Sequence, residues 1–325
     1  MNITYIGIWV LFLVLAACGE RQPAFSSVQR GESTLVSNRL TEPSDNYRDK
    51  GALLLTRFKS LDELKSVIDI EYSDFGSTQS VKLTHRSRNR VSISVLESGV
   101  DESDFTRAKY GNLLDRIRLV MMCPYALKNK SDLIRVEILA RRRPNLFGEG
   151  DKAFFDLAEE MVFHISDEDI QYMPTEDLSE KGYLNTFNHI TAQACISSLF
   201  SEELADFVAD IHERYAMPEL ITGEFTQEQI DDLETGPVDN YIDIVNNEWG
   251  QELGKSLKVK YGLSRETEWT PELLTDYLND VQNYYSWSFG IGFKPFRPQD
   301  EVIVKFTRKL NEVMLDLPEV RKRYY

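Results

Sequence analysis

Residues 51–145 mix two periodicities: some runs alternate apolar and polar positions, and one has the spacing of a helix. From residue 81 to 95 apolar side chains recur at every second position in two runs separated by residues 86–89, which predicts a β-hairpin. Between Asp104 and Met122 the apolar positions recur at helical spacing, so we expect one long helix there. A third alternating run, Ile134 to Ala140, predicts another strand. Residues 51–145 should therefore form a small α+β domain in which the hairpin and this strand pack on the helix.

Beyond Gly150 the apolar positions repeat at intervals of three and four residues, the spacing of amphipathic helices. Stripes of this kind run through residues 154–165, 204–215 and 303–317. Thr270 followed by Pro271 is a good N-cap and first-turn pair for a further helix. Residues 151–325 are thus predicted to be α-helical. The predicted fold class is α+β, with a small α+β N-terminal domain followed by a mainly α-helical C-terminal domain.

One predicted helix, residues 183–200, lies in a stretch from Gly182 to Ser201 that contains no Asp, Glu, Lys or Arg. A helix without charge on any face is normally surrounded by protein. Asn185, His189 and Gln193 share one of its faces, and buried polar groups left unpaired cost about 1–3 kcal/mol each. A close neighbour must therefore supply hydrogen-bond partners.

The helix predicted from Val238 to Gly254 can be that neighbour. One of its faces carries Asp243, Asn247, Gly250 and Gly254. Glycine inside a helix costs roughly 1 kcal/mol relative to alanine, so two glycines indicate the close approach of another backbone. We expect the Asn185-His189-Gln193 face to pack against the Asp243-Asn247-Gly250 face.

The N-terminus has a different character. The apolar stretch Ile3 to Ala17 holds no charged side chain and ends in Leu15-Ala16-Ala17-Cys18. About 15 apolar residues are fewer than the roughly 20 that a transmembrane helix needs, and they suit a cleaved signal peptide. The ending resembles the lipobox of bacterial lipoproteins, whose cysteine is lipidated and becomes the new N-terminus. The resemblance implies a signal peptide at residues 1–17 and a membrane anchor on Cys18.

The residues after Cys18 extend this interpretation. Gly19 follows the cysteine where Asp would imply retention in the inner membrane, so the resemblance favours the outer membrane, with the protein facing the periplasm. Residues 18–50 are polar and show no apolar periodicity, which predicts a flexible tether. Roughly 30 such residues have a root-mean-square span of roughly 30 Å.

The charge balance narrows the range of partners. The 325 residues include 53 acidic and 37 basic side chains, for a net charge of −16. Such a chain repels phosphate backbones and anionic headgroups, which argues against nucleic-acid binding and against electrostatic docking on a membrane. We expect membrane contact through the lipid on Cys18, and a protein or an envelope polymer as partner. Cys123 and Cys195 are compatible with a disulfide or with two buried thiols.

Three short motifs follow one another between Asn185 and Gly254. They are Asn185-x-x-x-His189, His212-Glu213 and Asp243-x-x-Asn246-Asn247-x-x-Gly250. Their order and spacing resemble an uncharacterised helical domain of bacterial secreted proteins, including the C-terminal tips of some polymorphic toxins. That family usually carries Arg before the first histidine and Trp three residues after it, where this chain has Asn188 and Ala192. The family has no settled activity to transfer.

Two interpretations of these residues remain open. As a hydrolase or toxin-related effector, the chain would use His189, His212, Glu213 and Asp243 as catalytic residues on an envelope substrate. His189, His212 and Asp243 would also suffice to hold a divalent metal with an open coordination position. The sequence contains no zincin, EF-hand, nucleophile-elbow or phosphate-loop motif.

The alternative is a structural network. The same residues, together with the polar cluster Asn185, Gln193, Asn246 and Asn247, would form satisfied hydrogen bonds that orient the core of a binding or scaffold protein. Because the sequence lacks a recognised catalytic motif, we favour this second interpretation.

Overall fold

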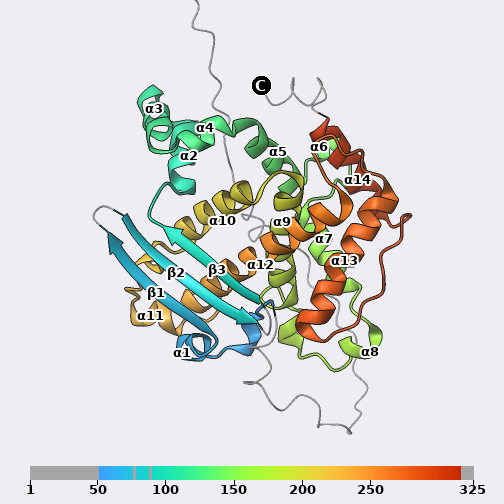
Figure 1. Ribbon diagram of the computed structural model, residues 1–325, viewed down its shortest axis with the longest axis horizontal. Helices are drawn as coiled ribbons and strands as arrows, with labels where there is room; N and C mark the ends of the chain where they lie inside the picture. The colour runs from blue at the N-terminus through green and yellow to red at the C-terminus, as the bar shows by residue number, and fades with distance from the viewer. Residues whose placement is uncertain (1–50, 76–77, 88–89, 316–325) are drawn as a thin grey trace, which may run out of the picture.

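The computed structural model describes residues 51–75, 78–87 and 90–315, so the predicted signal peptide, Cys18 and the tether lie outside the described residues. The predicted α+β class is confirmed: a small antiparallel sheet comes first and helices follow (Figure 1). The strands, in spatial order, are β1 (Ile68–Phe75), β2 (Thr78–Ser87) and β3 (Arg90–Glu97). The helices are α1 (Leu61–Lys65), α2 (Glu102–Tyr110), α3 (Leu113–Met122), α4 (Pro124–Lys128), α5 (Lys130–Ala140), α6 (Pro144–Phe147), α7 (Phe154–Phe163), α8 (Asp167–Ile170), α9 (Tyr183–Leu199), α10 (Glu202–Ala216), α11 (Gln227–Asp231), α12 (Pro237–Tyr261), α13 (Pro271–Phe289) and α14 (Glu301–Met314), with short 3-10 turns η3 (Leu55–Arg57), η4 (Thr175–Leu178) and η5 (Pro218–Ile221).

The predicted hairpin is β2–β3, in which Val81 lies opposite Leu96 and His85 opposite Ser92. The inward face of β3 carries Ser92, Ser94 and Leu96, while Val91, Ile93 and Val95 are exposed. The small serines let α12 approach the sheet, since Ser94 Oγ lies 3.5 Å from the carbonyl oxygen of Ile244. The apolar side of β3 therefore faces outward, because a helix backbone occupies the space beneath the serines.

The third strand predicted at Ile134–Ala140 is wrong, because these residues belong to α5. This helix buries Leu133, Ile134, Val136, Ile138 and Leu139, so it is covered on several faces. Apolar residues on every side of a helix produce an alternating run by coincidence. The third strand is instead β1, which pairs with β2 from Ile68 opposite His85 to Phe75 opposite Thr78.

The single long helix predicted from Asp104 to Met122 is also wrong. The chain forms α2 and α3, with a break at Gly111 and Asn112. Asn112 starts the second helix through a capping box in which its side chain accepts from the Leu114 and Asp115 backbone amides. The sheet does not pack on these helices, and its inner face contacts α12 and η5 instead.

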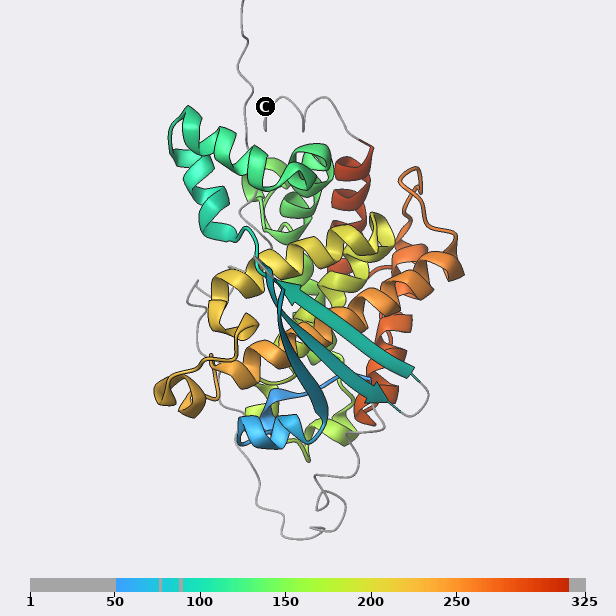
Figure 2. The same ribbon diagram turned by 60° about the vertical axis from the view of Figure 1, so that its left-hand side comes forward.

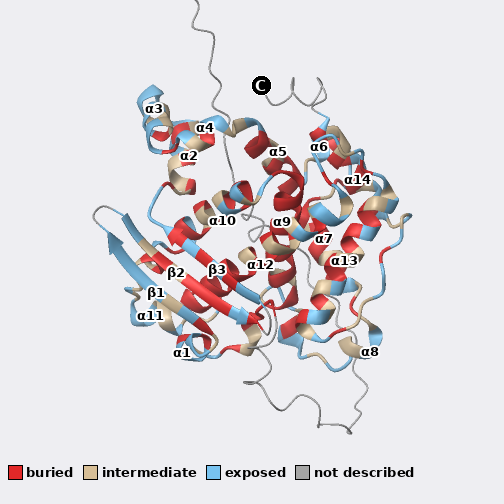
Figure 3. Cartoon of the chain, in the orientation of Figure 1, coloured by how far each residue is buried: buried red, intermediate tan, exposed pale blue. Residues whose placement is uncertain are grey.

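The helical predictions of the C-terminal half are confirmed. The helix α9 coincides with the predicted charge-free helix, and α12 includes the predicted Val238–Gly254 and continues to Tyr261. The Thr270 side chain accepts from the Leu273 backbone amide and caps α13, as predicted. In two views the helix α9 lies between other helices, and colouring by burial shows it almost wholly enclosed (Figures 2 and 3).

Two hydrophobic clusters form the core. The larger one surrounds α9 with residues of α5, α7, α10, α13 and α14, and the smaller one lies between the sheet, α1, η5 and α12. Both clusters include residues from before 145 and from after 151, so the sheet region and the helical region share their cores. Cys123 and Cys195 are both buried as free thiols. Of the helices in the described ranges, none combines the length and the apolar character needed to span a bilayer.

Candidate functional site

The site is built on the contact between α9 and α12, which two glycines allow. A Cβ atom on Gly250 would lie 2.7 Å from the Ile190 carbonyl oxygen and 2.8 Å from the Gln193 Cβ, closer than real Cβ atoms approach other atoms. A Cβ on Gly254 would collide with the Ala194 carbonyl oxygen in the same way. The two backbones can meet only because both positions lack a side chain. The predicted packing of these two helix faces is confirmed.

A row of hydrogen bonds crosses this contact, and we call its five members the His189 network. Asn185 Nδ2 donates to Asp243 Oδ1 over 3.0 Å, and Asp243 Oδ2 lies 3.3 Å from His189 Nε2. On the other side of the imidazole, His189 Nδ1 lies 3.0 Å from Asn247 Oδ1. Asn247 Nδ2 donates in turn to Glu213 Oε1 of α10 over 3.1 Å. The polar face of α9 that was predicted to need partners therefore finds them on α12, and Glu213 of α10 pairs in turn with Asn247.

The protonation state of the His189 network follows from its geometry and burial. Because Asn247 uses its amide group to donate to Glu213, its oxygen faces His189, and Nδ1 must carry the hydrogen. Burial lowers the pKa of His189 to about 4, although the hydrogen bond with Asn247 opposes this shift. Burial raises the pKa of Asp243 to about 7. Below neutral pH, a protonated Asp243 therefore donates to the unprotonated Nε2 of a neutral His189.

Glu213, at the far end of the row, lines a small pocket between β3, α10 and α12. Burial raises the pKa of Glu213, and the nearby carboxylates of Asp243 and Asp239 raise it further. The cavity volume is about 10 Å³, room for about one water molecule. The pocket is also lined by further carboxyl groups and by the polar side chains Ser94, Asn247 and Gln251.

The other carboxyl groups of this pocket, Asp206, Asp210 and Glu248, also have raised pKa values. Burial, and then the neighbouring Asp206, raise the pKa of Asp210 to about 8 against the opposing effect of Arg214. Burial, and then Asp206, raise the pKa of Glu248 to about 7. The carboxyl groups of Asp210 and Glu248 can therefore carry protons near neutral pH, beside room for about one water molecule.

The remaining predicted site residues are separated from the network. His212 Nδ1 lies 3.0 Å from Glu102 Oε1 and so connects α10 to α2. Gln193 accepts a weak hydrogen bond from Gln251 over 3.4 Å. Asn246 points away from His189 and pairs with both backbone groups of Leu53, at 2.9 Å each. Asn246 thus holds the backbone at Leu53, near the start of the described residues, against α12.

The three predicted metal ligands are not gathered around one point. Both ring nitrogens of His189 and both carboxyl oxygens of Asp243 already have protein partners, and His212 joins Glu102. Among residues 51–75, 78–87 and 90–315, the group whose ligand atoms lie within 4.8 Å of one another consists of Glu202, Glu248 and Glu252. The Lys255 ammonium group occupies that cluster, at 2.6 Å from Glu202 and 2.7 Å from Glu252.

Two buried polar contacts were not predicted from the sequence. His85 is fully buried and accepts from Trp249 Nε1 over 2.9 Å, which ties the sheet to α12. Its position two residues after Leu83, on the inward face of β2, is the signal that could have revealed it. Lys309 is also buried, and its ammonium group lies 2.8 Å from Asp151. A helical lysine in an amphipathic stripe gives no such signal.

Searches against protein-family models, curated proteins and solved structures find no match to this chain. Its function must therefore be inferred from its own residues.

Proposed function

We propose that this protein is a lipid-anchored component of the bacterial cell envelope with a binding or scaffold role, in which the His189 network fixes the helical core. The observation that carries the role is that both ring nitrogens of His189 and both carboxyl oxygens of Asp243 have partners inside the protein. His189 is 5% exposed, Asn247 3% and Glu213 2%, and each is bonded to another member. A catalytic group must touch its substrate, and these groups touch each other.

The anchor rests on Leu15-Ala16-Ala17-Cys18, which lies outside the described residues. The body described here is compatible with a tethered protein, since it folds around two apolar clusters of its own. The proposed location is the periplasmic side of the outer membrane.

Mutation of Cys18 tests the anchor. Wild-type protein should enter the detergent phase and carry an acyl mass on its first residue, whereas Cys18→Ala should accumulate as unlipidated precursor. Cys123→Ala is the matched control, because this buried thiol should not affect lipidation. Mature, soluble wild-type protein without acyl mass would overturn the anchor.

A second candidate function, an acid/base hydrolase, is favoured by one observation. The carboxyl groups of Glu213, Asp210 and Glu248 have raised pKa values beside a shared pocket, a property common at active sites. Glu213→Gln distinguishes the two functions. If purified protein hydrolyses peptidoglycan and this variant abolishes turnover at an unchanged melting temperature, the protein is a hydrolase.

A further inference from the structure

The helix α3 and its flanks form a lobe with an unusual surface, and we call residues 107–130 the α3 lobe. Leu119 is the one residue of α3 that is buried. Leu114 is 73% exposed and Met121 78%, and Tyr110, Leu113, Ile117, Met122 and Leu127 are exposed as well. The lobe stands at one end of the molecule, above the sheet in Figure 2. Contiguous exposed apolar side chains on a soluble body mark a binding surface.

Most of the exposed apolar residues of α3 occupy one side of the helix. At about 100° per residue, Leu113, Ile117 and Met121 share a face, with Leu114 at its edge. Leu119 lies on the opposite side, toward the body. Arg116 and Arg118 lie one on each flank of the apolar face. The helix therefore presents an apolar stripe between two guanidinium groups, facing away from the protein.

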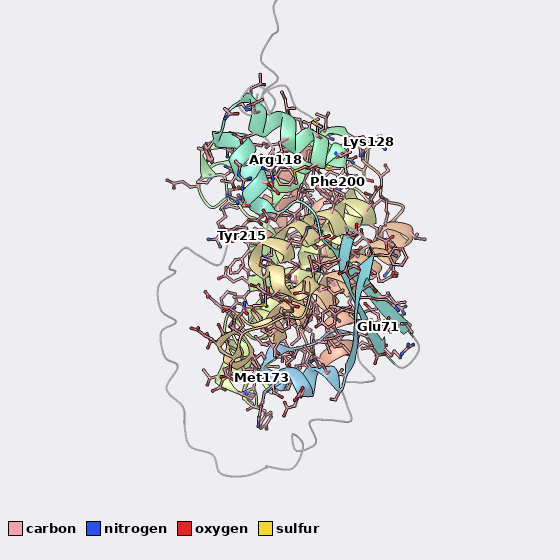
Figure 4. The ribbon with its side chains drawn as sticks, turned by 90° about the vertical axis from the view of Figure 1, so that its left-hand side faces the viewer. Glu71, Arg118, Lys128, Met173, Phe200 and Tyr215 are labelled. Carbon is pink, nitrogen blue, oxygen red and sulfur yellow. The ribbon has the colours of Figure 1, made fainter. Side chains whose placement is uncertain are left out.

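The charge of the lobe is opposite to that of the chain. It contains six basic side chains, Arg107, Lys109, Arg116, Arg118, Lys128 and Lys130, and one acidic side chain, Asp115. The whole chain has a net charge of −16. Figure 4 shows Arg118 and Lys128 together at one end of the molecule, with Met173 at the other. The acidic residues at the start of α2 precede the lobe: Glu102 is buried against His212, and Asp104 lies 3.6 Å from Arg107.

We propose that the α3 lobe docks on the anionic phospholipid surface of the membrane that holds the lipid on Cys18. The proposal rests on the proposed anchor. A helix of this length cannot cross a bilayer, which takes roughly 20 residues, but an apolar face flanked by basic side chains suits the interface. The arginine stems lie along the apolar region while their charged ends reach the phosphates.

Charge favours an anionic membrane over a protein partner for the α3 lobe. The basic side chains of the lobe complement anionic headgroups, whereas the acidic remainder of the chain is repelled and turns away from the surface. The predicted tether of roughly 30 residues joins the described body near α1, at the end away from α3 in Figures 1 and 2, and a fully extended chain of that length spans up to roughly 100 Å, enough for the lobe to reach the membrane in which the lipid sits.

Vesicle binding tests the proposal with the mature chain carrying Cys18→Ser, which lacks the lipid and keeps every described residue. This protein should co-sediment with vesicles of phosphatidylethanolamine and phosphatidylglycerol, and less with vesicles of phosphatidylcholine alone. Binding should weaken as salt rises, because salt screens charges at a surface. Equal binding to both kinds of vesicle, or binding to neither, would overturn the proposal.

Two pairs of variants locate the contact. Leu113→Gln with Leu114→Gln should weaken binding by at least about tenfold, because the apolar area that enters the interface is lost. Val259→Gln, at an equally exposed apolar position on α12, should leave binding unchanged. Arg118→Gln should weaken binding severalfold and reduce its salt dependence, while Lys59→Gln, exposed elsewhere, should do neither.

The outcomes separate docking from anchoring. If wild-type protein carries its acyl mass but the Cys18→Ser form does not bind anionic vesicles, the proposed anchor is supported and the docking proposal is overturned. If the Cys18→Ser form dimerises in solution and the leucine variants make it monomeric without any vesicle binding, the lobe is an interface between copies, and the membrane proposal is overturned.

Discussion

The helices α9 and α3 reverse the usual relation between polarity and burial. The helix α9 carries Asn185, His189 and Gln193 and is almost wholly enclosed. The helix α3 carries a stripe of leucine, isoleucine and methionine and buries only Leu119. In the interior, polar side chains are tolerated where other helices supply partners at hydrogen-bond distance. At the surface, apolar side chains persist where something outside the chain can cover them.

Whether a helix is buried therefore depends on its neighbours as much as on its composition. The polar side chains of α9 are tolerated in the interior because Asp243 and Asn247 meet them with matching donors and acceptors, and Glu213 pairs with Asn247. Such a network specifies one register between two helices, since a shift along the axis would leave several groups unpaired. The apolar face of α3 has no equivalent partner within the described part of the chain.

The largest effect is expected where α9 and α12 touch. Gly250→Leu should destabilise the protein by more than about 3 kcal/mol or prevent folding, because even a Cβ there would lie 2.7 Å from the Ile190 carbonyl oxygen. Helix propensity alone predicts the opposite, since leucine is a better helix former than glycine by almost 1 kcal/mol. Urea denaturation measures the change. Ser256→Leu, exposed on the same helix, is the control and should have little effect.

A Gly250→Leu protein as stable as the wild type would show that the two helices do not approach closely. The network would then lose its basis, because the distances from His189 to Asp243 and Asn247 depend on that approach.

The sequence predicted the α9–α12 contact well, for a definite reason. The lack of charge on α9 and the two glycines of α12 are strong local signals, and each implies a partner. The role of His212 was harder to predict, since its contact with Glu102 joins residues far apart in the sequence. The carboxyl groups of Asp206, Asp210 and Glu248 gave no signal, because acidic residues on amphipathic helices are normally solvated.

Two apolar faces in the first half, on β3 and on α3, are exposed, and the sequence pattern did not reveal this. Hydrophobic periodicity indicates which side of an element is apolar, but it does not identify what covers that side. Val91, Ile93 and Val95 of β3 are apolar yet exposed, and the serines between them face α12. The residues of α3 have the pattern of a core helix, yet its apolar face is exposed.

The next largest effect concerns Asp243. Asp243→Ala should cost about 2–3 kcal/mol, because it leaves Asn185 and His189 without a partner in a buried site. Asp243→Asn should cost less than about 1 kcal/mol, since its amide can donate to His189 Nε2 while its oxygen still accepts from Asn185. Asp276→Ala, at an exposed position of α13, is the control.

Denaturation of these variants also decides where the proton lies. If His189 were a buried cation paired with an ionised Asp243, Asp243→Asn would leave that charge unpaired and cost about 3–5 kcal/mol. Such a result would contradict a neutral His189.

A smaller effect is expected from pH. Carboxyl groups titrate near pH 4 in unfolded chains, and the folded-state pKa values of Asp243 and Glu248 are raised to about 7. Their contribution to stability is complete below about pH 4 and is lost as the pH rises through about 7. His189 acts oppositely: its folded-state pKa is lowered to about 4, so its contribution is present above about pH 6.5 and is lost as the pH falls toward 4.

The raised carboxyl groups outnumber the single histidine over the same pH range, so the melting temperature should be highest near about pH 4 and fall by a few degrees toward pH 8. Glu248→Gln should flatten this fall, whereas Glu228→Gln, exposed on α11, should not. Differential scanning fluorimetry across this range provides the measurement. A melting temperature that rises steadily to pH 8 would mean that these carboxyl groups are ionised at no cost in the folded protein.

The smallest effect is expected on the exposed face of α3, and two positions of one helix give a matched pair. Leu114→Gln should change the free energy of unfolding by less than about 0.5 kcal/mol, because the side chain is 73% exposed. Leu119→Gln should cost about 2–4 kcal/mol, since it replaces the one buried apolar side chain of the same helix with a polar one. Helix propensity differs little between the two sites, so the contrast measures burial alone. If Leu114→Gln proved as destabilising as Leu119→Gln in the isolated protein, another part of the same chain would cover the apolar face of α3. That face would then belong to the core, and the difference between the two helices would disappear.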